Sequence, residues 1–157
     1  MGTYKRKSWV QKRDIALEPV VKRITKDFAG MKAGERMLIA TPQVVDQYIR
    51  QLPKGCSGTL TQMRKDLAAE YQADTTCPVT SGIFLRIVAE AAYEEYQKGM
   101  ALSRITPFWR ILSPDSPTAC KLSFGTDLLK QQRHREQLDA PPAAARGTTR
   151  KKTVSAE

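Results

Sequence analysis

The clearest pattern along the chain is an apolar face with helical spacing between residues 41 and 52. A hydroxyl residue followed by proline, Thr41-Pro42, is a typical helix start, because threonine can cap free N–H groups and proline suits the first helical position. The apolar residues that follow are Val44, Val45, Tyr48, Ile49 and Leu52. Since Pro53-Lys54-Gly55 ends the pattern, the sequence predicts a helix over 41–52 with this face inward.

Two other segments carry helical spacing. Residues 15–28 predict a short helix, because their apolar positions recur at helical intervals and Pro19 can occupy a first turn. Those apolar residues are Ile15, Val20, Val21, Ile24 and Phe28. Residues 62–71 predict a second helix, for which the hydroxyl of Thr61 would be the cap.

A longer apolar helix is predicted to run to about Lys98, with either Thr80 or Ser81 as its cap. It follows the helix over 62–71 after a connection, and it carries a basic residue in its first half. This order of helix, connection and helix is that of a helix-turn-helix. The charged segment 128–138 predicts a last helix.

After Gly99 the pattern changes from helical to extended. The segment 105–112 is apolar and aromatic, 113–117 is rich in serine and proline, and 121–125 is compatible with a short strand. Two short strands around a turn, placed after a helix-turn-helix, would form a wing. The predicted fold class is therefore mainly α: a winged helix-turn-helix with a short β wing.

Charge divides the chain into three parts. The net charge is +10, of which +6 lies in residues 1–40, +2 in 41–138 and +2 in 139–157. Basic arms add sequence-independent affinity for phosphate backbones, although a solubilising tail can have the same composition. We expect residues 1–40 to be a basic arm with a short helix, 41–138 to be the folded domain, and 139–157 to be a disordered basic tail, because that segment lacks large apolar residues.

Several function classes are excluded by composition. No apolar run reaches the roughly 20 residues of a membrane span, and no apolar stretch follows the first charged residues as in a secretory signal. The cysteines, Cys56, Cys77 and Cys120, lack metal-site spacing, and the histidine, His134, lies in a charged run. We therefore expect a cytoplasmic, nucleoid-associated protein that has no cofactor and no metal.

Short motifs follow one another in a defined order over residues 41–138. They are Leu52-Pro53-Lys54-Gly55, Thr59-Leu60-Thr61-Gln62-Met63-Arg64, Arg86-Ile87-Val88-Ala89-Glu90-Ala91, Pro107-Phe108-Trp109-Arg110-Ile111, and a Gly125 that lies 11 positions before Glu136. This order resembles the DNA-binding domain of the alkylguanine-DNA alkyltransferases, in which I-P-x-G, T-Y-G-x-I-A, R-A-V-G-x-A and P-C-H-R-V are followed by a closing helix.

The resemblance implies a member that has lost the transfer reaction. Phe108 stands at the position of the alkyl-accepting cysteine, and Trp109 at that of the histidine that helps to form its thiolate. A phenyl ring cannot accept an alkyl group, and an indole is not a useful base. Glu136 would then lack the histidine that it orients. The chain resembles the cysteine-less, alkyltransferase-like branch, which binds alkylated guanine in duplex DNA without repairing it.

The resemblance also implies contact residues. Arg86 matches the arginine that enters the duplex and replaces an extruded base, and Leu60 stands in place of a tyrosine that contacts phosphate. The predicted DNA contacts are Thr59, Leu60, Thr61, Gln62, Ser81 and Arg86, and the predicted base pocket is Pro107, Phe108, Trp109 and Arg110. The alternative is a surface arginine on an amphipathic helix and an aromatic run that packs in the core.

The predicted function is non-enzymatic binding of double-stranded DNA by a monomer. The protein would recognise O6-alkylguanine or flipped bases, and its protein partners would be nucleotide-excision repair proteins. A second possibility is a protein-interaction or transcription-associated module without lesion recognition, because fold resemblance does not carry function by itself. A third is an alkyl transferase that uses Cys120.

Overall fold

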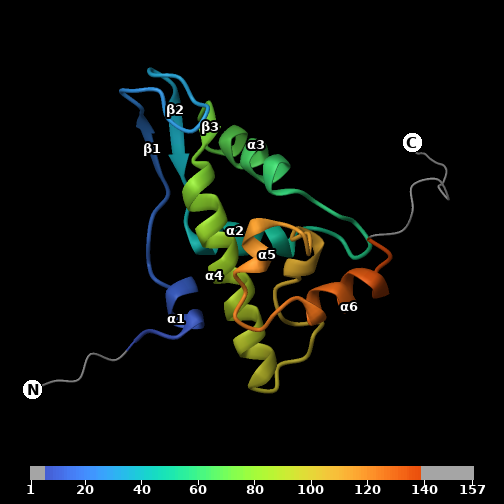
Figure 1. The fold of residues 1–157 in the computed structure, drawn as a ribbon. Coiled ribbons are helices and arrows are strands. Elements are labelled where there is room, and N and C mark those ends of the chain that lie inside the picture. Colours follow the sequence, from blue (N-terminus) through green and yellow to red (C-terminus); the bar gives the residue numbers. More distant parts are fainter. Residues whose placement is uncertain (1–5, 139–157) are drawn as a thin grey trace, which may run out of the picture.

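The computed structural model describes residues 6–138 as a mostly helical chain with one small sheet (Figure 1). The helices are α1 (Trp9–Arg13), α2 (Pro42–Arg50), α3 (Leu60–Glu70), α4 (Pro78–Gln97), α5 (Pro117–Cys120) and α6 (Asp127–Arg135), together with the 3-10 helix η1 (Phe108–Arg110). The strands are β1 (Val20–Arg23), β2 (Arg36–Ile39) and β3 (Thr75–Thr76). The predicted tail over 139–157 lies outside the described residues.

Helix α4 is the centre of the fold: α1, α2, α3, α5 and η1 pack against it, and α6 packs against η1 (Figure 1). Its inner face is apolar and contains two alanines, Ala89 and Ala92, which let neighbouring elements approach closely. The core that surrounds it combines Leu38, Val45, Ile49, Met63, Leu67, Leu85, Val88, Phe108, Leu112 and Leu129. Because this core takes residues from nearly every element, it fixes the position of each segment relative to α4.

The predicted helices over 41–52, 62–71 and 128–138 are confirmed, with small shifts at their ends. Thr41 caps α2 as expected, because its hydroxyl accepts a hydrogen bond from the Val44 N–H at 3.2 Å. The cap of α3 is Thr59 and not Thr61, since Thr59 is extended and accepts from the Gln62 N–H at 3.0 Å.

The long apolar helix is also confirmed, but it begins earlier than predicted. Pro78 occupies its first turn and Cys77 is the N-cap residue. Neither Thr80 nor Ser81 caps it, because both lie inside the first turns. The Ser81 hydroxyl donates to the Cys77 carbonyl oxygen at 2.7 Å, one turn back in the same helix.

The predicted helix over 15–28 is wrong, because this segment contains strand β1. Val20 and Val21 are β-branched and pair in antiparallel register with Ile39 and Leu38 of β2. β2 in turn pairs with β3 in parallel, with Met37 opposite Thr75. The three-stranded sheet, in the order β1-β2-β3, therefore joins the segment before residue 40 to the connection between α3 and α4.

The predicted wing is also wrong, since the structure has no strand over 105–112 or 121–125. η1 lies in the first segment, and α5 begins at the end of the expected turn over 113–117, with Ser116 as its cap and Pro117 in its first turn. The side chains of Phe108 and Leu122 fill the core instead of forming one face of a strand. The antiparallel strand pair of this fold lies between α1 and α2, at β1 and β2.

Among the described residues, no helix is both long and apolar enough to cross a bilayer.

Candidate nucleic-acid interface

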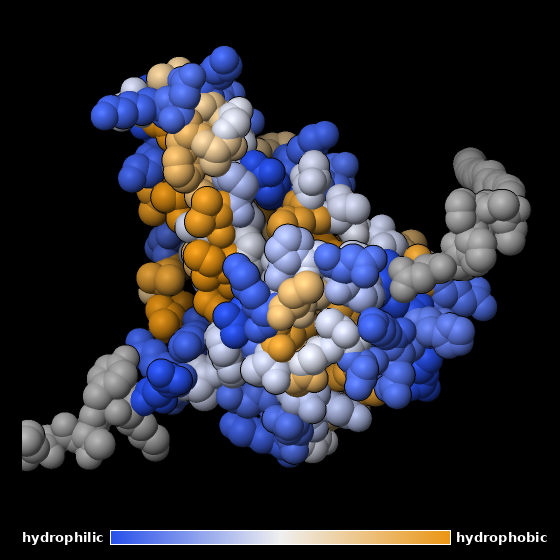
Figure 2. All heavy atoms as spheres, viewed as in Figure 1, coloured by the Kyte–Doolittle hydropathy of each residue, from blue (hydrophilic) through white to orange (hydrophobic). Residues whose placement is uncertain are grey.

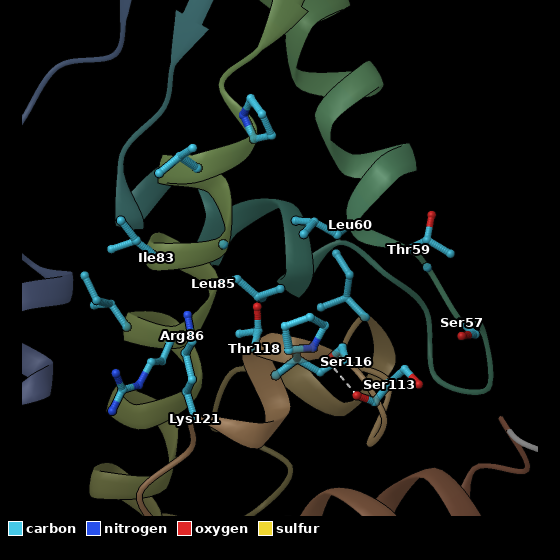
Figure 3. A pocket seen from close by; sticks show the side chains of 18 of the residues that line it. Ser57, Thr59, Leu60, Ile83, Leu85, Arg86, Ser113, Ser116, Thr118 and Lys121 are labelled. Carbon is cyan, nitrogen blue, oxygen red and sulfur yellow. Dashed lines mark hydrogen bonds between the residues drawn. The ribbon is translucent and has the colours of Figure 1, made fainter. Parts of the chain in front are cut away.

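A groove with a volume of about 850 Å³ runs along the first half of α4 (Figure 3). It is bordered by α1, by the start of α3, and by the segment from Ile111 to Lys121, which includes α5. We call it the α4 groove. Figure 2 shows an apolar band over α4 with hydrophilic residues beside it.

The floor of the α4 groove is one face of α4. Val79, Gly82, Ile83 and Arg86 follow one another at spacings of three and four residues, and all four border the groove. Val79 and Ile83 are each 52% exposed, although both are large apolar residues. Leu85, which also borders the groove, packs into the core together with Val88, Ala89 and Ala92. The core is therefore built from these residues, and the side chains of Val79 and Ile83 are left available to a partner.

Basic side chains border the groove, and no Asp or Glu of residues 6–138 does. The basic residues are Lys12, Arg86, Lys121 and Arg133. Neither Lys12 nor Lys121 has a carboxylate partner within the described part of the chain. Arg133 is buried and donates to the carbonyl oxygens of Trp109 at 2.7 Å and Leu112 at 3.1 Å, so it braces the wall. The positive charge that a ligand in the groove could reach therefore comes from Lys12, Lys121 and the partly exposed Arg86.

Arg86 is held in place from two sides. Its Nε lies 3.5 Å from an oxygen of Glu90, which is an ion-pair distance but not a hydrogen bond. Its guanidinium also lies over the ring of Trp9, 5.2 Å from the centroid. Glu90 is buried, and it accepts hydrogen bonds from the N–H and the hydroxyl of Ser123 at 2.8 and 2.5 Å. The side chain of Arg86 is 36% exposed, so it reaches the groove but is already engaged.

Helix α1 reaches the groove because polar contacts dock it on α4. Glu94 accepts hydrogen bonds from the N–H groups of Trp9 and Val10 at 3.2 and 3.1 Å. Arg13 is buried and lies 2.8 Å from Glu95. These contacts bring Trp9 over Arg86, and Lys12 lies over the same ring, 4.3 Å from its centroid.

Hydroxyl groups line the rims of the groove. Ser57 and Thr59 lie on the rim before α3, while Ser113, Ser116 and Thr118 lie on the rim formed by the α5 segment (Figure 3). Figure 3 shows Thr118 and Lys121 extending from this segment toward α4. Hydroxyl and ammonium donors on two rims of an apolar floor are suited to a ligand that carries oxygen acceptors at its edges.

The structure brings only part of the predicted DNA contacts together. Arg86, Thr59 and Leu60 border the groove, whereas Thr61 and Gln62 do not. Thr61 borders a separate hollow between α3 and β3, and the Gln62 side chain is exposed and donates to Asp66 at 2.8 Å.

Ser81 cannot contact DNA as predicted. Its side chain is 1% exposed and its hydroxyl bonds within α4.

The predicted base pocket is divided between the core and a second cavity. Phe108 is fully buried and packs edge-on against Trp109 and Phe124, so it lines no open pocket. Pro107, Trp109 and Arg110 border a second cavity of about 550 Å³, which shares no lining residue with the α4 groove.

Glu136 lies at the centre of a hydrogen-bond network beside this cavity. Its carboxylate accepts from Trp109 Nε1 at 2.7 Å, from Arg110 Nε at 2.9 Å and from the Gly55 N–H at 3.0 Å. Glu136 lacks a histidine partner, as expected, but Trp109 takes that place, because an indole N–H can donate to a carboxylate as an imidazole N–H does. Burial would raise the pKa of Glu136, but these bonds and the charge of Arg110 outweigh burial and hold the pKa below its ordinary value.

The site residues that sequence reasoning missed are Trp9, Lys12, Val79, Ile83, Thr118 and Lys121. Val79 and Ile83 could have been found, because on a helical wheel they fall away from the face of Leu85, Val88 and Ala92. The lysines carry no such local signal, since only the packing of α1 and α5 brings them beside α4.

Within residues 6–138 no group of three or more His, Cys, Asp or Glu side chains could hold a metal ion. Cys56, Cys77 and Cys120 are free thiols, of which Cys77 is buried, and none of them borders the α4 groove. No protein-family model, curated protein or solved structure matches this chain.

Proposed function

We propose that this chain is a non-enzymatic, double-stranded DNA-binding protein and that the α4 groove is its DNA contact. The observation that carries the proposal is the composition of the groove: hydroxyls on both rims, a lysine on α1 and another after α5, and no bordering carboxylate among the described residues. Lysine side chains release counterions when they neutralise phosphates, and hydroxyls position the duplex through its backbone. α3 and α4 supply a helix pair in which α4 is the helix presented to DNA.

The resemblance to the alkyltransferase DNA-binding domain supports this proposal at two places. Arg86, Thr59 and Leu60, which the resemblance assigns to DNA, border one groove. Trp109 and Glu136 occupy the matched positions of a histidine and its carboxylate partner and are joined by a 2.7 Å hydrogen bond. With a buried phenyl ring at position 108, the site is suited to binding and not to alkyl transfer.

Recognition of O6-alkylguanine is the finer form of the proposal. Because Phe108 is buried, an extruded base could not stack on its ring, and it would have to enter either the α4 groove or the second cavity beside Trp109 and Arg110. Lesion recognition therefore predicts a difference in affinity between modified and unmodified duplexes, whereas plain DNA binding predicts none.

The test is a fluorescence-anisotropy titration of the purified full chain, at low salt, with matched duplexes that contain or lack one O6-methylguanine. We expect binding to both, and a weaker affinity when Lys12 and Lys121 are replaced by alanine. The matched control is Lys130→Ala on α6, an exposed lysine outside the groove. No binding of either duplex would overturn the function, while equal affinity for the two would exclude lesion recognition alone.

A second candidate, an interaction module for a protein partner, is favoured by one observation. Val79 and Ile83 are large, apolar and half exposed, as in surfaces that bind proteins. The two candidates differ in their response to salt. A DNA contact loses affinity steeply between 50 and 200 mM salt, whereas an apolar protein contact is nearly indifferent to it.

A further inference from the structure

The most exposed side chains on the groove face of α4 are apolar and lie on its first turns. Val79 and Ile83 are one turn apart, and Gly82 between them leaves the backbone uncovered. A Cβ added at Gly82 would approach only the Thr118 hydroxyl, at 3.7 Å, so Gly82 leaves a shallow depression in the helix surface between Val79 and Ile83. The groove therefore presents two apolar projections that are flanked by the cations Lys12 and Lys121.

This face is poorly suited to reading bases by hydrogen bonds. The side chains that read base edges in the major groove are mainly Arg, Lys, Asn, Gln, Asp and Glu. Of the residues at 79, 82, 83 and 86, only Arg86 has a polar side chain, and it is engaged with Glu90 and Trp9. An apolar side chain can instead enter the minor groove, slide between two base pairs and unstack them, which kinks the duplex.

We propose that Ile83, supported by Val79, is an apolar wedge that enters the minor groove of duplex DNA and partly unstacks one base step. The inference rests on the proposed function and names the residue that deforms the DNA. Ile83 lies nearer the start of α4 than Arg86, by one helical turn, and is 52% exposed. Lys12 and Lys121 would hold the phosphates on both sides while the isoleucine is inserted, so charge and shape act on the same duplex segment.

The wedge is tested with a duplex that carries 2-aminopurine at a central step and a donor–acceptor dye pair at its ends. Wild-type protein is expected to raise 2-aminopurine fluorescence and the energy transfer between the ends. Ile83→Ala is expected to remove most of both signals while lowering affinity by no more than about tenfold, because the lysine contacts remain. The exposed position and the helix-forming alanine keep this variant folded.

The controls separate the wedge from its alternatives. Ile83→Leu should retain both signals, and Val20→Ala, a half-exposed apolar residue on β1 outside the groove, should leave them unchanged. Distamycin, which fills the minor groove, should compete with the protein, and methyl green, a major-groove ligand, should not.

Three results would overturn the wedge. One is DNA binding without any rise in either signal, and another is an Ile83→Ala variant that keeps both. Competition by methyl green alone would instead place α4 in the major groove, with its apolar face against thymine methyl groups. If wild-type protein binds no duplex at low salt, the proposed function fails as well, so the two failures are distinguishable.

Discussion

Glu136 is the residue that holds η1 and the loop after α2 in position. Its side chain is 5% exposed, and it binds Trp109 and Arg110 of η1 and the backbone of Gly55, which come from two separate parts of the chain. A buried carboxylate that is fully paired is costly to disturb, because any change leaves its partners without a counter-charge. The network therefore fixes η1 and the loop after α2 relative to α6.

We predict that Glu136→Gln lowers the free energy of unfolding by about 3 kcal/mol, because it leaves the largely buried Arg110 guanidinium unpaired. Urea denaturation at pH 7 measures the change. Glu70→Gln, at an exposed position at the end of α3, is the control and should be close to wild type.

The stability difference between wild type and Glu136→Gln should depend on pH. The folded-state pKa of Glu136 is held below its ordinary value, so the carboxylate stabilises the fold above that value and the contribution is lost as the pH falls through the folded-state pKa. The difference between wild type and Glu136→Gln should therefore be full at pH 7 and shrink under acid conditions. A difference that stays constant down to acid unfolding would contradict this assignment.

At the scale of elements, the docking of α1 on α4 decides how the groove is shaped. Its contacts are mainly polar: Glu94 with two N–H groups of α1, and Glu95 with Arg13. A short helix held in this way opens more readily than one held by an apolar face. When α1 leaves, Trp9 and Lys12 leave the groove and Arg86 loses the ring that covers it.

We predict that Glu95→Ala raises the amide exchange rate over residues 9–14 by about tenfold, since it removes one charge-assisted hydrogen-bond pair from the docked state. Hydrogen exchange followed by mass spectrometry measures this, and α2 should keep its wild-type protection. Equal protection of α1 in both proteins would show that the Glu94 hydrogen bonds suffice to dock it.

At the scale of the whole molecule, the position of the charges matters more than their sum. The chain has a net charge of +10, of which the groove takes its two unpaired lysines from α1 and from the turn after α5. A duplex in the groove would contact both lysines at once, and each would neutralise about one phosphate.

We therefore predict that the slope of log K against log salt for duplex DNA becomes about two units shallower when Lys12 and Lys121 are both replaced by alanine. Lys130→Ala should leave the slope unchanged, although it also removes one positive charge from the molecule. An equal loss per charge removed in both variants would mean that net charge, and not the α4 groove, governs the affinity.

The sequence by itself determined the helices that carry the site. The apolar spacing and caps of α2, α3 and α4 are local, because hydrogen bonds in a helix join residues four positions apart. The resemblance in motif order, and not the helical spacing, selected Arg86, Thr59 and Leu60, which the structure gathers along one groove. Their order along the chain was sufficient to suggest a contact with DNA.

Only the tertiary structure decided the sheet, the absent wing and the full groove. β2 pairs with a β3 segment that lies 38 positions away (Met37 opposite Thr75), and no local pattern specifies such a partner. The aromatic run at 105–112 is apolar because Phe108 fills the core, which a periodicity cannot distinguish from a strand. Lys12 and Lys121 both lie beside α4 because α1 and α5 pack against that helix. The positions of α1 and α5 are set by the burial of surface in the folded protein and not by the residues next to each lysine in the sequence.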